Sequence, residues 1–197
     1  MSQKTENRRA ALRERLLEAA EIRMARDGVE TLRARDLAQD AGCSVGAIYN
    51  VFEDLTALAM AVNARTFLKI GQGVAEVSDP DLPPAEHLTR LAHAYLGFAR
   101  QNTGLWRALF DLNTRTDDDI PSWYTNALDT LFDHIRAPVA QLFPTEDVAG
   151  VDLMTRTLFS AIHGVISLGL AQRISAVPDD RIEEMIAKLL RSVSEKS

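Results

Sequence analysis

Residues 34–53 read ARDLAQDAGCSVGAIYNVFE, and the spacing of small and apolar residues in this stretch decides the fold. We predict two short helices, near 34–41 and 45–52, joined by a tight turn at Gly42. Glycine suits such a turn because it tolerates a left-handed backbone. Small Ala38 would let the two helices approach closely. The stretch therefore has the spacing of a helix-turn-helix.

The second helix of such a unit lies in the major groove of DNA, while the first crosses the phosphate backbone. Gly46 and Ala47 carry almost no side chain, so the helix could sit deep in the groove, where Ala47 could touch a thymine methyl. We predict a reading surface of Ser44, Val45, Gly46, Ala47, Tyr49 and Asn50. Arg8, Arg33 and Arg35 are predicted to neutralise backbone phosphates.

The same twenty residues could instead form a plain helical hairpin inside a bundle. Ile48 of the second helix would pack against Leu37 and Ala41 in either case. A plain hairpin, however, would not need to leave small and polar residues on its outer helix, where long helix-forming side chains are favoured. We therefore favour the helix-turn-helix.

Residues 28–58 resemble the DNA-binding signature of the TetR family of transcriptional regulators. The resemblance rests on Gly28, Arg35–Ala38, Ala41–Tyr49, Phe52 and Leu58, and the helix before them also fits. It implies a homodimeric repressor that binds a palindromic operator in double-stranded DNA and releases it when a small-molecule inducer binds. We predict no enzymatic activity and no cofactor.

Two positions depart from the family pattern. Tyr49-Asn50-Val51-Phe52 stands where many members have Tyr-x-His-Phe, and Leu55 stands where they have lysine. The substitutions remove two usual phosphate contacts, so we expect lower affinity and a flatter salt dependence.

Helical spacing recurs along the whole chain and no stretch alternates like a strand, so we predict an all-α fold. The first helix should end at Gly28 in a left-handed cap, and Pro80, Pro83 and Pro84 should interrupt the middle of the chain. The predicted helices lie near 5–27, 34–41, 45–52, 55–73, 85–101, 103–113, 121–142, 147–173 and 178–194. We predict a DNA-binding domain over 1–54 and a ligand-binding and dimerisation domain over 55–197.

The chain carries a net charge of −6, unevenly distributed over its 197 residues. Residues 1–15 hold five basic and two acidic side chains, whereas residues 56–197 hold 13 basic and 18 acidic side chains. This distribution suits a protein that touches a polyanion at one end. The single cysteine and the absence of a leader predict a cytoplasmic location. The longest apolar stretch, 157–172, is shorter than the ~20 residues of a membrane span and predicts a buried helix.

Aromatic residues of the middle helices mark a candidate inducer pocket, although aromatic residues at this spacing are more often core. The predicted pocket consists of Trp106, Phe110, Trp123, Tyr124, Phe159 and His163. Residues 160–170 resemble a carboxy-terminal domain of the Trp-His-Gly type. Ser160, Gly164 and Ser167 form a face of small residues that could meet a second subunit, with 121–142 as the other half of the contact.

Other chemistry finds little support in the sequence. The four histidines have no metal-binding spacing, Asp117–Asp119 is expected to be a solvated turn, and Cys43 is expected to be structural. An enzyme would need a nucleophile and base pair, and none stands out. A helical sensor or adaptor that has lost operator binding is the alternative, and retention on promoter DNA at low salt would separate the two.

Overall fold

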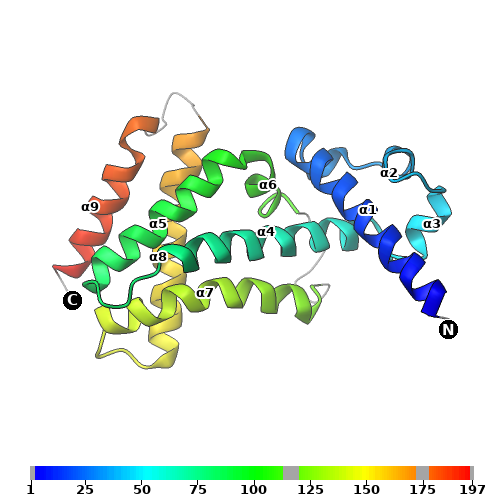
Figure 1. Ribbon diagram of the computed structural model, residues 1–197. Helices are drawn as coiled ribbons and strands as arrows, with labels where there is room; N and C mark the ends of the chain where they lie inside the picture. Colours follow the sequence, from blue (N-terminus) through cyan, green and yellow to red (C-terminus); the bar gives the residue numbers. More distant parts are fainter. Residues whose placement is uncertain (1–2, 113–119, 172–177, 196–197) are drawn as a thin grey trace. The chain divides into compact units, whose positions relative to one another are not determined.

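The computed structural model describes residues 3–112, 120–171 and 178–195 (Figure 1). Its described residues form helices and no strand, which confirms the all-α prediction. The elements are α1 (Gln3–Asp27), η1 (Val29–Thr31), α2 (Ala34–Asp40), α3 (Val45–Tyr49), α4 (Leu55–Val77), α5 (Pro84–Gln101), α6 (Thr103–Ala108), α7 (Ser122–Leu142), α8 (Val148–Leu170), η3 (Asp179–Arg181) and α9 (Ile182–Ser194).

The chain divides into two compact units. The first unit comprises Met1–Leu68 and Asn102–Ala127, and the second comprises Lys69–Gln101 and Leu128–Ser197. Helices α4 and α7 each contribute residues to both units. The domains predicted from the sequence, 1–54 and 55–197, separate DNA binding from ligand binding, whereas the two units are defined by how tightly their residues pack. The predicted division by function stays a prediction.

The first unit is built around the apolar face of α1. Leu16, Ala20 and Met24 recur at steps of four and are fully buried. α1 ends at Asp27, and Gly28 follows it with a φ of 86°, as the sequence predicts. The core also takes in residues of α2, α3, α4 and α6, among them Leu37, Ile48, Leu58, Val62 and Leu105.

A glycine on α6 sets how closely this helix packs on α1. A Cβ atom at Gly104 would lie 1.9 Å from the carbonyl oxygen of Ala25, far inside any real contact distance. The close approach therefore requires glycine at this position. α6 ends at Ala108, earlier than the predicted end at 113, but Leu109 is still buried and Leu112 packs against the core from outside the helix.

The second unit packs α5, α8 and α9 against one another. α5 starts at Pro84, the last proline of the predicted break, where the missing N–H of proline is harmless. α9 follows the short helix η3, and its buried stripe consists of Ile182, Ile186 and Leu190. Arg100 of α5 binds Asp179 and Glu183 at 3.1 and 2.8 Å and so links α5 to this end of the chain.

Helix α8 is longer than the apolar stretch seen in the sequence. It spans 23 residues, and by length and composition alone it could cross a membrane. The helix predicted from the sequence to be buried is buried on one face only, where Leu158, Ile162 and Ile166 lie, and 28% of its most apolar window is buried. α8 also carries Asp152 and Arg156, which bind one another at 3.0 Å and pair with charged side chains of α7.

Candidate functional site

The turn between α2 and α3 has the predicted geometry. Gly42 has a φ of 62°, and the Cys43 N–H donates a hydrogen bond to the Ala38 carbonyl at 2.9 Å. Ile48 is fully buried in the same cluster as Leu37. The left-handed turn and the Ile48 anchor therefore fix α3 against α2.

The rest of α3 is turned to solvent. Ser44 caps the helix, and its Oγ accepts a hydrogen bond from the Ala47 N–H at 3.3 Å. Val45 and Tyr49 are 38% and 49% exposed. Gly46 and Asn50 are exposed as well, and Ala47 is half-buried. Apart from the Ile48 anchor, α3 thus offers its small and polar residues to a partner.

Arginines of α1 hold the first helix of the motif. Arg23 Nε lies 2.5 Å from Asp40 Oδ2 and its Nη1 lies 3.6 Å from Asp36 Oδ2. The hydrogen bond from Arg23 lowers the pKa of Asp40. Arg15 Nε donates to the Ala41 carbonyl at 3.0 Å, just before the turn. These contacts orient α2, and with it α3, relative to α1.

The three predicted phosphate-binding arginines are all exposed. Arg33 is held in place, because its Nη1 donates to the carbonyls of Glu30 and Leu32 at 2.8 and 2.9 Å. Arg8 and Arg35 form no ion pair within the described parts of the chain. Their charges are therefore available to an anionic partner.

Arg9 and Arg13 of α1, neither of them predicted as a site residue, line a groove together with Val51. The Arg13 guanidinium also lies over the Phe52 ring, 5.3 Å from its centroid. The signal in the sequence is the four-residue step between the two arginines, which places them on one face of α1.

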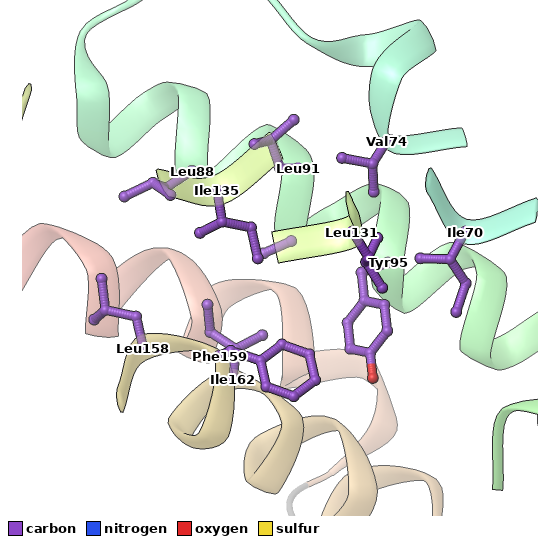
Figure 2. A pocket seen from close by; sticks show the side chains of 11 residues that line it. Ile70, Val74, Leu88, Leu91, Tyr95, Leu131, Ile135, Leu158, Phe159 and Ile162 are labelled. Atoms are coloured by element: carbon purple, nitrogen blue, oxygen red, sulfur yellow. The ribbon is translucent and has the colours of Figure 1, made fainter. Parts of the chain in front are cut away.

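The second unit contains an apolar cavity of about 50 Å³ that is partly open to the surface (Figure 2). Helices α4, α5, α7 and α8 all contribute side chains to its wall. The lining consists of Ile70, Val74, Leu88, Leu91, Ala92, Tyr95, Leu131, Ile135, Leu158, Phe159 and Ile162. Aliphatic side chains thus dominate, and the hydroxyl oxygen of Tyr95 is the sole heteroatom on the side chains that Figure 2 labels.

Tyr95 uses its hydroxyl outside this apolar wall. The hydroxyl oxygen lies 3.1 Å from Nδ1 of His163, a residue that does not line the cavity. The His163 ring stacks on Phe159 with ring centroids 5.8 Å apart. Burial lowers the pKa of His163, so the imidazole is neutral at pH 7.

A family model described as the tetracyclin repressor-like C-terminal domain matches residues 88–193, more than half of the chain. The chain belongs to the TetR family of transcriptional regulators. That description does not test the Trp-His-Gly subtype, which stays a prediction. No curated protein sequence matches this TetR-family chain significantly.

Solved structures share the TetR-like fold at low sequence identity. A Rhodococcus sp. RHA1 protein of unknown function is 23% identical, with a TM-score of 0.73 and coverage of 94% of both chains. RolR in complex with resorcinol is 20% identical, with a TM-score of 0.67 over 98% of this chain and 97% of its own. A candidate regulator from Saccharomonospora viridis in complex with choline is 22% identical, with a TM-score of 0.64, and the match covers 93% of this chain and 95% of its own.

The six predicted pocket residues of this TetR-family chain fall into two groups. Phe159 and His163 belong to the second unit, and Phe159 lines the cavity. The other four belong to the first unit, where Trp106 and Tyr124 are buried while Phe110 and Trp123 are 49% and 46% exposed. The aliphatic wall was not predicted, because its members look like ordinary core residues in the sequence.

The metal, acidic-turn and cysteine candidates have different outcomes. Within the described residues, no group of three or more His, Cys, Asp or Glu side chains could hold a metal ion. Asp117–Asp119 lies outside the described residues. Cys43 is a free, half-buried cysteine next to the turn glycine.

Proposed function

We propose that this TetR-family protein is a repressor that binds a palindromic operator as a homodimer and releases it when a small-molecule inducer binds. The exposure of α3 around its single buried anchor, Ile48, carries the proposal. A recognition helix must present its outer residues to base edges. Ser44, Val45, Gly46, Ala47, Tyr49 and Asn50 would form this reading surface, with Arg8, Arg33 and Arg35 on the phosphates.

Helix α4 supports a route from the inducer to DNA. It begins at Leu55, directly after the helix-turn-helix, and its later residues Ile70 and Val74 line the apolar cavity. A ligand that pushes these side chains would move the helix that carries the DNA-binding motif. Successive major grooves on one DNA face are ~34 Å apart, so a small change in head spacing would lose one half-site.

The outer face of α8 supports a homodimer. Leu153 and Leu168 are 68% and 53% exposed although they lie on the most apolar helix. Ser160 is exposed and Gly164 is half-buried on the same helix. The apolar residues Leu131 and Phe132 of α7 are buried within their own unit, so α8 is the better contact helix. A second copy of α8 would bury this face symmetrically.

Binding to a duplex from the gene's own promoter region tests the proposal. Fluorescence anisotropy over a salt series should show specific retention, and Asn50→Ala or Tyr49→Ala should weaken specific binding by about 1–3 kcal/mol. Arg35→Ala should weaken binding to any sequence and make the log–log salt slope shallower by about 1.

Arg26→Ala is the matched control for Arg35→Ala. Arg26 pairs with Asp27 at 2.6 Å at the carboxyl end of α1, away from α3 (Figure 1), so its loss removes the same charge without a phosphate contact. If the protein shows no retention even at low salt, the adaptor that has lost operator binding replaces the repressor.

Sedimentation velocity tests the dimer. Leu168→Glu should dissociate it, because a charge would be buried in an apolar contact. Ile22→Glu is the control, since Ile22 is an equally apolar side chain that is 66% exposed on α1. A dimer that survives Leu168→Glu would place the contact elsewhere.

A further inference from the structure

The wall of the second unit's cavity has an unusual chemistry for a ligand site. Ligand pockets usually combine apolar surface with a few polar groups that fix orientation. Here ten of the eleven lining residues have purely hydrocarbon side chains, and the eleventh, Tyr95, directs its hydroxyl to His163. No charged side chain lines the wall.

We propose that the inducer is a compact, uncharged hydrocarbon, with alkylbenzenes the best match. It would bind in this cavity between Leu91, Ile135 and Ile162, without a hydrogen bond. This inference rests on the proposed function, which gives the cavity its role as the inducer site. Tyr95 and Phe159 favour an aromatic ligand, because their rings lie 5.8 Å apart along the wall and can pack edge to face on a third ring.

Polar ligands are selected against by the same wall. A hydroxyl that loses water and finds no partner weakens binding by roughly 5- to 100-fold, and an unpaired charge weakens it far more. Resorcinol carries two hydroxyls and choline a permanent charge. These two compounds, bound by the related structures, are therefore poor matches to this cavity.

The size of the cavity sets a further condition. Its volume of about 50 Å³ is well below the ~150 Å³ of an engineered cavity that binds benzene. An alkylbenzene would therefore press on the lining side chains, which include Ile70 and Val74 of α4. Movement of α4 would in turn reach the DNA-binding motif at its amino end.

Calorimetric titration of the wild-type protein with toluene, phenol and benzylammonium tests the ligand class, because these probes share one ring and differ in polarity. We expect toluene to bind most tightly, phenol at least about fivefold more weakly, and benzylammonium not at all. Tighter binding of phenol or benzylammonium, or no binding of toluene, would overturn the inference.

Two cavity variants locate the site. Ala92→Leu should fill the cavity and reduce toluene affinity by at least tenfold, whereas Ala94→Leu makes the same change on α5 away from the wall and should leave it unchanged. Should Ala92→Leu fail to fold, Ile162→Val enlarges the cavity instead and should tighten toluene binding. Equal affinity in Ile162→Val and the wild type would overturn the assignment to this cavity.

Operator release, measured with the same three probes, separates this inference from the proposed function. If toluene binds but leaves the DNA complex intact, the hydrocarbon site stands and ligand-induced release fails. If a polar compound releases DNA equally well from the wild type and from the cavity variants, the repressor proposal stands and the hydrocarbon inducer is wrong.

Discussion

Gly42 and Gly46 lie four residues apart around the turn of the helix-turn-helix. Substitution by alanine should lower the stability of the protein at Gly42 and keep or raise it at Gly46. A Cβ atom at either site would meet nothing within 4 Å, so steric clashes do not contribute. Gly42 has a φ of 62°, where an L-residue loses roughly 1–2 kcal/mol. Alanine also reduces the conformational entropy of the unfolded chain, and this offsets about 0.4–1 kcal/mol of the loss. We expect a net loss of about 1 kcal/mol.

Gly46→Ala should instead keep or raise stability. Gly46 lies within the helix α3 with an ordinary helical backbone, where alanine is favoured by up to about 1 kcal/mol. The added methyl would nevertheless stand on the proposed reading surface. We therefore expect Gly46→Ala to bind operator DNA more weakly while folding at least as well as the wild type.

Urea unfolding followed by circular dichroism measures both stabilities, and thermal melting gives a second estimate. A loss of about 1 kcal/mol should lower the Tm by roughly 2–4 °C in a chain of this size. Wild-type stability in Gly42→Ala would refute the left-handed turn. Unchanged DNA affinity in a fully folded Gly46→Ala would refute the close approach of α3 to the groove.

Three further substitutions probe contacts within each unit. Gly104→Ala should lower stability by at least about 2 kcal/mol in urea unfolding, because α6 must move off the Ala25 carbonyl; an unchanged midpoint would contradict this close approach. Asn63→Ala should lose about 1–3 kcal/mol, because Asn63 is fully buried and donates to the Ala108 carbonyl at 3.0 Å; a loss below 0.5 kcal/mol would show that this bond contributes little. Burial lowers the pKa of His87, so the unfolded chain takes up a proton at higher pH than the folded chain, and stability should fall as the pH drops below about 6.5. His87→Gln should flatten the dependence of the urea midpoint between pH 7 and 5, and an equally steep profile in both proteins would assign the effect to other groups.

The helices and the helix-turn-helix follow from local sequence. Gly28 and Gly42 mark the places where the backbone turns left-handed, and both have a positive φ in the structure. Ile48 is buried while Val45, Gly46 and Tyr49 are exposed, as helical spacing against Leu37 requires. Such features depend on residues no more than about a dozen positions apart, so their pattern can be read directly along the chain.

The apolar cavity depends on tertiary structure alone. Ile70, Leu91, Ile135 and Ile162 come from four helices spread over more than ninety residues, and each one reads in the sequence as an ordinary core residue. Whether such side chains close up completely or leave a space is decided by how the helices pack, to within the volume of a few methyl groups. A sequence pattern shows which residues form the buried face of a helix. The space left between two buried faces is set only when the helices pack together.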